Sequence, residues 1–265
     1  MTTLNKRLYI GSNLKMYKNV RQTMDFLTQL ASLTENISRE TIDLFIIPSY
    51  TSLYQASLKI DHRLIRLGAQ NMYWEDQGPF TGEISPRMLE ELGLEIVEIG
   101  HSERRQLFGE TDQTVNRKVH SCLHHGMTAL VCVGETLEEK EANLSAERLR
   151  IQVKGALHGV AEEQLDHIWI AYEPVWAIGE HGIPATADYA GLAHEVIRGV
   201  LCELFLEKGM DIPILYGGSV NRENALDLIR QPEINGLFIG RSAWEADNFD
   251  KIIREVLPVW QAKIG

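Results

Sequence analysis

Short apolar runs alternate with longer segments of helical periodicity along the whole chain. Each run is nearly continuous in apolar residues, which is typical of strands covered on both faces of a parallel sheet. Strands are predicted in this way at residues 8–11, 44–47, 64–69, 96–99, 129–133, 168–172, 214–216 and 237–239.

The segments between these runs place apolar side chains on one face of a helix, three or four residues apart. Examples are Met24, Leu27, Leu30 and Ala31, then Val115, Val119 and Leu123, and finally Phe249, Ile252, Ile253, Val256 and Trp260.

Eight strand–helix units in about 250 residues are what a closed (β/α)₈ barrel requires. No Ser/Gly-rich linker or low-complexity tract divides the chain, so a single barrel domain over residues 1–265 is predicted. An open doubly wound sheet is the competing architecture. It is disfavoured because no Gly-x-Gly-x-x-Gly motif follows the first run.

The charge balance narrows the class of partner. The chain has 26 Lys plus Arg against 37 Asp plus Glu, a formal net charge of −11. Nucleic acid and anionic membrane surfaces require clustered positive charge, so neither is expected as a partner. An anionic ligand must then be attracted by a few local groups.

The cysteines and the start of the chain suggest a cellular location. Cys122, Cys132 and Cys202 are embedded in apolar segments and are interpreted as reduced core thiols of a cytoplasmic protein. Residues 1–7 lack a signal-type apolar stretch, and no later segment is apolar for long enough to span a bilayer.

Polar residues and glycines gather directly after the predicted strands. They are Asn13 and Lys15 after the first, His101 and Glu103 after the fourth, Glu173 after the sixth, Gly217, Gly218 and Ser219 after the seventh, and Gly240 and Arg241 after the eighth. The carboxyl ends of the strands form the face on which barrel enzymes build their active sites. This coincidence predicts an enzyme.

Glu173 ends an apolar run and is followed by Pro174. Proline removes a backbone donor and keeps the preceding residue extended, so strand pairing should stop there. A carboxylate at such an exit is partly desolvated, which makes it a stronger base once it is ionised.

The glycine-rich turns are candidates for binding phosphate. Each turn is expected to lead into a helix and to leave backbone N–H groups free for an anion. Gly217 and Gly218 allow a close approach, Ser219 would donate its amide at a helix start, and Lys15 would supply a point charge. Each of these features alone is also common in ordinary turns and surfaces.

His101 is the candidate proton donor. Ser102 is predicted to be the N-cap of a short helix, and a helix N-terminus that faces an imidazole favours its neutral form. A neutral imidazole can donate a hydrogen bond to a carbonyl. The other eight histidines are interpreted as structural, and their spacings form no convincing metal site, so neither a metal nor a cofactor is expected.

A base, a neutral donor, a cation and a phosphate cradle on one face suggest proton transfer beside a carbonyl in a small phosphorylated substrate. The chain resembles the triosephosphate isomerase family over almost its whole length. The motifs that carry the resemblance are Asn13-Leu14-Lys15-Met16, Gly100-His101-Ser102-Glu103-Arg104-Arg105, Phe108-Gly109-Glu110, Cys132-Val133-Gly134-Glu135, residues 171–179 and Tyr216-Gly217-Gly218-Ser219-Val220.

The resemblance implies a role for each site residue. Glu173 would remove a proton from carbon, and His101 would move protons among the oxygens of an enediol(ate). Lys15 would stabilise charge on the substrate, Asn13 would orient it, and Glu103 would support the site. The phosphate would be bound by Gly179, Gly218, Ser219, Gly240 and Arg241.

The resemblance also implies a lid and a dimer. Residues 174–186 would close over the phosphate and exclude water. The family is typically homodimeric, with a loop after the third strand that reaches into the neighbouring site. Here this loop is residues 70–85, and Thr81 would approach Asn13 of the other subunit. The loop's aromatic residues also suggest burial against a partner.

Several positions depart from the usual family pattern. The lid is longer, lacks the usual lysine and contains Pro184; Arg241 replaces the second glycine of a Gly-Gly pair, and Leu14 replaces a common Trp. These changes resemble a branch that acts on tetrulose phosphates in erythritol breakdown. The implied reaction converts L-erythrulose 1-phosphate into D-erythrulose 4-phosphate. This substrate carries one CH₂OH group more than the three-carbon substrate, so the same base and donor could act on it.

Other functions stay open from the sequence. The same contacts could serve a triosephosphate isomerase of glycolysis in which the lid and turn changes are neutral. A catalytically silent phosphate-binding barrel would not need Lys15, His101 and Glu173 together. Barrel synthases with a similar phosphate site would need different acid and base groups.

Overall fold

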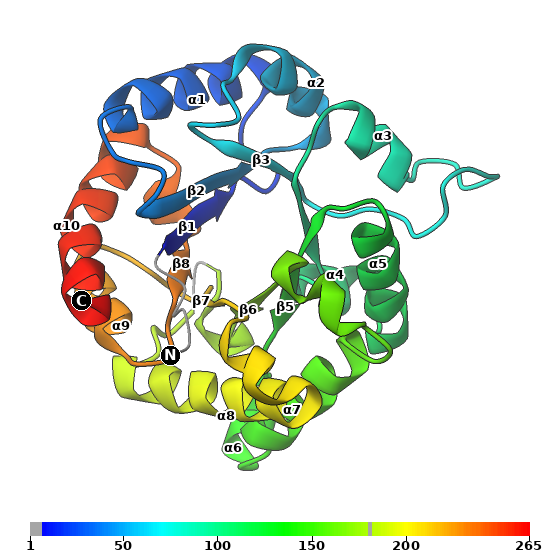
Figure 1. Cartoon of the computed structure of the whole chain (residues 1–265), viewed down its shortest axis with the longest axis vertical. Coiled ribbons are helices and arrows are strands. Elements are labelled where there is room, and N and C mark those ends of the chain that lie inside the picture. Colours follow the sequence, from blue (N-terminus) through cyan, green and yellow to red (C-terminus); the bar gives the residue numbers. More distant parts are fainter. Residues whose placement is uncertain (1–6, 180–181) are drawn as a thin grey trace.

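A computed structural model describes residues 7–179 and 182–265. Parallel strands close into one barrel in chain order, and the last strand pairs with the first (Figure 1). The strands are β1 (Leu8–Asn13), β2 (Ile42–Ile47), β3 (Arg66–Ala69), β4 (Ile96–Ile99), β5 (Thr128–Val133), β6 (Ile168–Tyr172), β7 (Ile214–Tyr216) and β8 (Gly236–Phe238).

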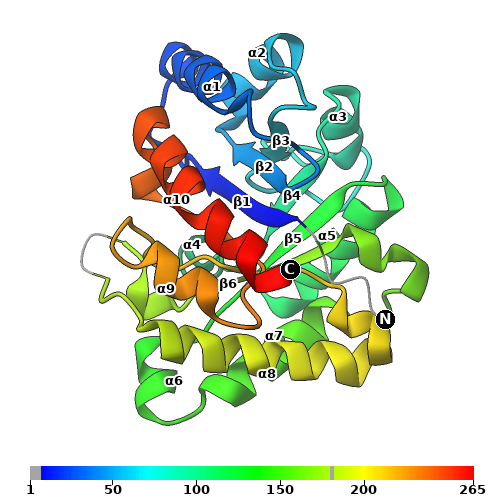
Figure 2. The ribbon, with the colours of Figure 1, turned by 60° about the vertical axis from the view of Figure 1, so that its left-hand side comes forward.

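Helices surround the barrel, and the last one, α10, packs beside α1 and completes the ring (Figure 2). The α-helices are α1 (Val20–Thr34), α2 (Tyr50–Lys59), α3 (Pro86–Glu91), α4 (Ser102–Phe108), α5 (Asp112–His124), α6 (Leu137–Glu141), α7 (Ser145–Ala156), α8 (Ala187–Phe205), α9 (Ala225–Arg230) and α10 (Ala246–Ile264). Short 3₁₀ helices are η1 (Glu162–His167), η2 (Val175–Ala177), η3 (Leu206–Met210) and η4 (Arg241–Ala243).

The closed barrel confirms the predicted fold class, and every predicted strand lies within two residues of an observed one. The difference that affects the polar residues is at β1, which was predicted to end at residue 11 and continues to Asn13. Asn13 is therefore the last residue of the strand instead of following it. It pairs with Ile47 of β2, so its backbone is fixed by the sheet.

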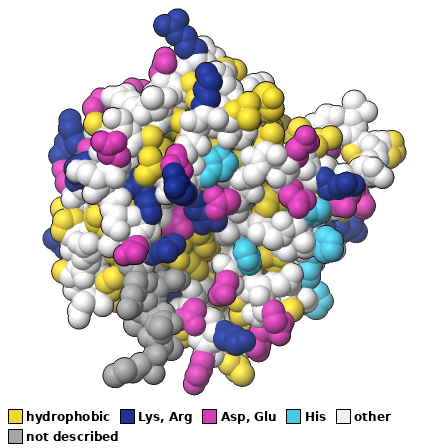
Figure 3. All heavy atoms as spheres, turned by 45° about the horizontal axis from the view of Figure 1, so that its top comes forward, with side chains coloured by type: hydrophobic (Ala, Val, Ile, Leu, Met, Phe, Trp, Pro, Cys, Tyr) yellow, Lys and Arg dark blue, Asp and Glu magenta, His cyan; other side chains and the backbone are white. Residues whose placement is uncertain are grey.

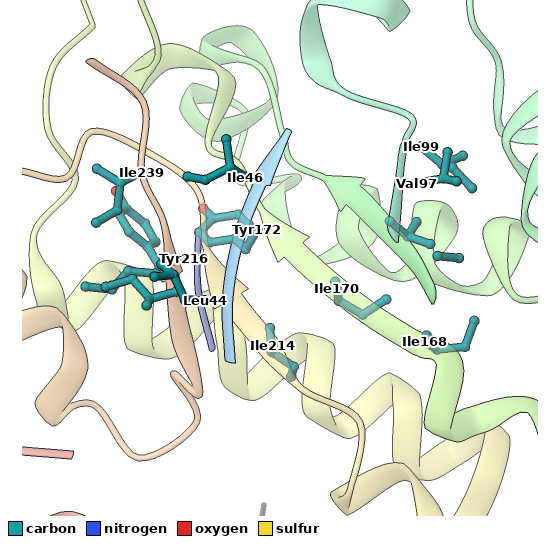
Figure 4. Packing of buried hydrophobic residues seen from close by; sticks show 14 of the residues in the cluster. Leu44, Ile46, Val97, Ile99, Ile168, Ile170, Tyr172, Ile214, Tyr216 and Ile239 are labelled. Atoms are coloured by element: carbon teal, nitrogen blue, oxygen red, sulfur yellow. The ribbon is translucent and has the colours of Figure 1, made fainter. Parts of the chain in front are cut away.

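Alternate residues of each strand pack into two separate clusters. Leu44 and Ile46 belong to the large cluster between the barrel and the helices, whereas Phe45 and Ile47 belong to the cluster inside the barrel. Figure 4 shows the outer set, which includes Ile168, Ile170, Tyr172, Ile214 and Tyr216. This two-residue period in a strand buried on both sides explains why the runs read as continuously apolar.

Aromatic rings fill the inside of the barrel. The Trp169 ring lies 4.8 Å from that of Tyr9 and 5.4 Å from that of Phe45, measured between ring centroids. Phe45 in turn stacks on Phe238 at 5.7 Å. Gly11 leaves the space for Phe45, because a Cβ at this position would lie 2.4 Å from the ring.

The cysteine prediction holds for two of the three residues. Cys122 and Cys132 are buried, as expected of core thiols, whereas Cys202 is only half-buried on α8. Among the described residues, no helix is both long and apolar enough to cross a membrane.

We predict opposite effects for two glycine-to-alanine substitutions. Gly11→Ala should lower the free energy of unfolding by about 1–3 kcal/mol or more, because the added methyl overpacks the barrel interior against Phe45. Gly199→Ala is the matched control: the glycine is exposed within α8, and nothing lies within 4 Å of its Cβ position. That variant should gain up to about 1 kcal/mol from helix propensity. Urea denaturation of both variants measures the difference, and equal effects would contradict the packing argument.

Candidate active site

A cleft of about 330 Å³ lies at the carboxyl ends of the strands. Its lining includes Gly217 and all ten residues to which the family resemblance assigned a catalytic or phosphate-binding role. These ten are Asn13, Lys15, His101, Glu103, Glu173, Gly179, Gly218, Ser219, Gly240 and Arg241. The structure thus brings together residues from five separate strand ends.

Glu173 is held at the wall of this cleft. Its backbone N–H donates to the Val133 carbonyl at 2.7 Å, one residue beyond the end of β6. A Cβ at Gly134 would lie 1.8 Å from the Glu173 carbonyl oxygen, and a Cβ at Gly217 would lie 2.9 Å from its Cγ. Gly134 therefore makes room for the Glu173 backbone, and Gly217 makes room for its side chain. The sequence had assigned Gly217 only to the approach of a phosphate.

The Glu173 carboxylate is 3% exposed and faces His101. Its Oε1 lies 3.4 Å from His101 Nε2, and its Oε2 accepts a hydrogen bond of 3.3 Å from the Ser102 backbone N–H. A carboxylate and an imidazole thus converge on the same point of the cleft.

His101 caps α4, where the sequence had predicted Ser102 as the N-cap. Its Nδ1 accepts the backbone N–H of Glu103 at 3.1 Å, and Ser102 is the first residue of the helix. An Nδ1 that accepts a hydrogen bond carries no proton, so Nε2 holds the proton in the neutral ring. This geometry turns the N–H of a neutral imidazole toward the cleft.

Lys15 adopts a backbone conformation that side chains rarely occupy, with φ of 50°. Its N–H donates to Asn13 Oδ1 at 2.6 Å, and Gln70 Nε2 donates to its carbonyl at 2.8 Å. Its Nζ forms an ion pair of 2.6 Å with Glu103 Oε1. These contacts hold a strained residue in place, as is common at functional sites.

The end of the cleft expected to bind phosphate is built from two turns. Gly240 precedes η4, so its turn does lead into a short helix as predicted. Ser219 differs, because α9 begins only at Ala225 and Ser219 lies in the intervening loop. A Cβ at Gly218 would lie 2.4 Å from Tyr216 Oη, so this glycine makes room for the tyrosine.

Glu98 is a site residue that the sequence analysis missed. It lies in β4 with its side chain 0% exposed, beneath the cleft. Asn13 Nδ2 donates to its Oε2 at 2.7 Å, and Cys132 Sγ donates to its Oε1 at 3.8 Å. The available signal was one acidic residue within an otherwise apolar strand.

Burial raises the pKa of the Glu98 carboxyl to about 7; Glu173 adds to this rise, whereas His101, the Asn13 hydrogen bond and Lys15 oppose it. Burial also raises the pKa of the Cys132 thiol well above its usual value. Among the described residues, Glu98, Cys132 and Glu173 form a group whose ligand atoms lie within 4.8 Å of one another. The raised pKa values of the Glu98 carboxyl and the Cys132 thiol favour the protonated forms of both groups. The expectation that no metal binds stays a prediction.

The segment expected to be the lid is anchored at its start. Trp176 Nε1 donates to Glu135 Oε1 at 2.8 Å, and Ile183 N–H donates to the Trp176 carbonyl at 3.2 Å. Glu135 is fully buried and also accepts hydrogen bonds from the hydroxyls of Tyr172 and Tyr189. Residues 180 and 181, part of the longer lid noted in the sequence, lie outside the described residues.

The loop after β3 begins beside the cleft at Gln70, but its tip around Thr81 does not line the cleft. Figure 1 shows it extending beyond the ring of helices near α3, and Thr81 is exposed. The Tyr73 ring packs on Trp74 at 4.0 Å and on Phe80 at 4.4 Å, measured between centroids. The aromatic residues therefore cover one another in part.

Comparison with known proteins identifies the family. A family model described as triosephosphate isomerase matches residues 8–256. A Rhizobium etli protein named L-erythrulose-1-phosphate isomerase is 45% identical over 251 residues, covering 94% of this chain and 92% of the relative. Proteins of the same name from Rhizobium meliloti and Brucella abortus are 46% and 44% identical, over 94% and 93% of this chain and 96% and 95% of each relative. The chain belongs to the triosephosphate isomerase family.

Proposed function

We propose that this protein is a cofactor-free isomerase that converts L-erythrulose 1-phosphate into D-erythrulose 4-phosphate through an enediol(ate). The observation that carries the proposal is the convergence of Glu173 Oε1 and His101 Nε2, 3.4 Å apart, in a cleft that also contains Lys15. A base and a neutral donor at this distance can act on adjacent atoms of one substrate.

In the proposed mechanism, Glu173 removes the proton from C3 of L-erythrulose 1-phosphate. The neutral His101 Nε2–H donates to the substrate oxygens at C2 and C3 and moves a proton between them. Lys15 offsets the negative charge that develops on the enediolate. Glu173 then returns a proton to C2, which gives D-erythrulose 4-phosphate without an oxidant or a metal.

The phosphate would lie at the far end of the cleft. Backbone N–H groups of the Ser219 loop and of Gly240 and Arg241 at the start of η4 would bind its oxygens. We propose that residues 174–186 close as a lid over the ester. Gly179, which belongs to this lid, would then contact the phosphate. Closure would exclude water from the enediolate and hold the ester in place, so that the enediolate does not eliminate its phosphate.

Two features favour the four-carbon substrate over the three-carbon one. The relatives that are 44–46% identical over nearly the whole chain carry the name L-erythrulose-1-phosphate isomerase. Arg241 lines the cleft where the family usually has a glycine. A site that hydrogen-bonds the added hydroxyl discriminates strongly against an analogue that lacks it.

We also propose a cytoplasmic homodimer. The loop of residues 70–85 projects from the chain (Figure 1). Leu107 and Phe108, at the end of α4, are 72% and 68% exposed. Apolar exposure of this kind favours a protein interface. Figure 3 shows acidic and basic side chains interspersed over one face of the molecule, in keeping with the expectation that neither nucleic acid nor a membrane is the partner.

Substrate preference tests the proposed reaction. The wild-type protein should have a higher kcat/KM with L-erythrulose 1-phosphate than with D-glyceraldehyde 3-phosphate, and Arg241→Gly should move the ratio toward the shorter substrate by about tenfold. Arg230→Ala, on the exposed face of α9, is the control and should leave the ratio unchanged. A wild-type preference for the three-carbon substrate would identify a triosephosphate isomerase instead.

Shortening the base tests the role of Glu173. Glu173→Asp retracts the carboxylate by one methylene, so kcat should fall by about 100-fold or more, whereas inhibition by inorganic phosphate should stay close to wild type. Glu223→Asp, in the loop after β7, makes the same chemical change at an exposed position outside the cleft and serves as control. Turnover retained in Glu173→Asp would remove this residue from the mechanism.

A charge at the tip of the projecting loop tests the dimer. Thr81→Arg should shift sedimentation from dimer to monomer and lower kcat, because the loop would no longer reach the neighbouring site. Ile151→Arg, at an exposed position of α7, is the matched control. A wild-type protein that sediments as a monomer with full activity would contradict the proposal.

A further inference from the structure

Glu98 places a carboxyl group among side chains that line the inside of the barrel. Ile96, two residues earlier on β4, and Cys132 on the neighbouring β5 belong to the interior cluster. Because side chains alternate along a strand, Glu98 points to the same side as Ile96. Barrel interiors are normally filled by branched apolar residues, so a carboxyl group here is costly unless it serves a purpose.

Little positive charge compensates an ionised carboxyl at this position, because Lys15 acts on it but is itself paired with Glu103. Among residues 7–179 and 182–265, no Lys or Arg forms an ion pair with Glu98. Its nearest basic group is His101 Nε2, 3.9 Å from Oε1, and that nitrogen belongs to a ring whose Nδ1 accepts a hydrogen bond. A buried carboxyl without a cationic partner keeps its proton instead of ionising.

The contacts of Asn13 explain what the carboxyl group holds in place. Asn13 Oδ1 accepts the backbone N–H of Lys15 and the side-chain amide of Gln70. One hydrogen of its Nδ2 goes to Glu98 Oε2. Asn13 also lines the cleft, so these hydrogen bonds fix a side chain of the binding site.

We propose that Glu98 is a positioning residue that stays protonated while Glu173 is ionised, and that it orients the Asn13 amide and keeps a second negative charge away from the reacting atoms. The expected effect of Glu98 on activity rests on the proposed function. The protonation of Glu98 does not depend on it.

The groups that face Glu98 determine how its ionisation acts on the site. They are Asn13 from β1, Cys132 from β5, Glu173 from the end of β6 and His101 from the end of β4, with Lys15 paired to Glu103 nearby. The pKa of Glu98 is raised to about 7 by burial. Above that pH, two carboxylates would lie beneath an enediolate, and the developing negative charge would be destabilised.

The pH dependence of catalysis is the first readout. For the wild type, kcat/KM with L-erythrulose 1-phosphate should fall roughly tenfold or more between about pH 7 and about pH 9. In Glu98→Gln the amide imitates the protonated carboxyl and cannot ionise, so this fall should vanish while activity near pH 6 is retained. The second ionisation of a phosphate ester, near pH 6, affects only the acid limb. Superimposable alkaline limbs in the two proteins would overturn the proposal.

The pH dependence of folding is a second readout that needs no substrate. The folded-state pKa of Glu98, about 7, lies above the reference value of 4.5, so the stabilising effect is complete below about pH 4.5 and is lost as pH rises through about 7. Between about pH 5 and about pH 8, the folding equilibrium constant of the wild type relative to Glu98→Gln should fall roughly 100-fold. Asp43→Asn is the matched control, because Asp43 is another buried carboxyl, at the start of β2 in an ion pair with Arg66, and does not line the cleft. Asp43→Asn should leave the fall of kcat/KM between about pH 7 and about pH 9 unchanged.

The wild-type protein provides the measurement if Glu98→Gln does not fold. Near pH 6 its infrared spectrum should contain the carbonyl stretch of a protonated carboxyl group, and this band should disappear by about pH 8. The Asp43→Asn variant should show the same band near pH 6, which excludes Asp43 as its source. An ionised Glu98 at about pH 6 would overturn the proposal whatever the substrate is. A wild-type protein inactive on both sugar phosphates but with this titrating carboxyl would instead refute the proposed function alone.

Discussion

Closure of the parallel sheet is the constraint on which the rest of this structure depends. Each strand is fixed by hydrogen bonds to two neighbours, so the carboxyl ends of β1, β4 and β6 are held at set positions around one opening. The side chains that follow these ends need only short reaches to meet. Glu173 and His101 approach to 3.4 Å because Glu173 is still bonded to β5 and His101 caps the helix after β4.

Space is as important as position in this site. Gly134 and Gly217 carry no side chain, and a Cβ at either one would collide with Glu173. The buried base therefore occupies volume that the flanking strand ends give up. The same principle operates deeper in the barrel, where Gly11 leaves room for the Phe45 ring. Close packing makes each such glycine specific to one neighbour.

The sequence predicted the barrel and the members of the cleft well, because both depend on short-range patterns. Apolar runs such as 168–172 mark buried strands, and polar residues after them must face the same end. Where a single side chain or a helix start lies in space was beyond its reach. The helix cap was placed on Ser102 instead of His101, since an imidazole Nδ1 can accept the same N–H, and Ser219 was placed at a helix that begins six residues later.

Glu98 was missed for a related reason. One acidic residue in a run of four still reads as an apolar strand, and only the three-dimensional arrangement shows that the carboxyl lies against Asn13 and Cys132. Burial raises the pKa of the Glu98 carboxyl. The pattern of apolar residues predicts that the strand is buried, but not how fully one side chain in it is.

The hydrogen bond from Ile183 to Trp176 has a consequence for the conformational entropy of the segment between β6 and α8. It ties the two arms of the segment between β6 and α8 to each other. If this segment closes over a substrate as proposed, arms linked in this way leave fewer backbone torsions to be fixed than free arms would. The loss of conformational entropy on closure is then smaller than for a free loop of the same length, and more of the binding free energy remains for holding the ester.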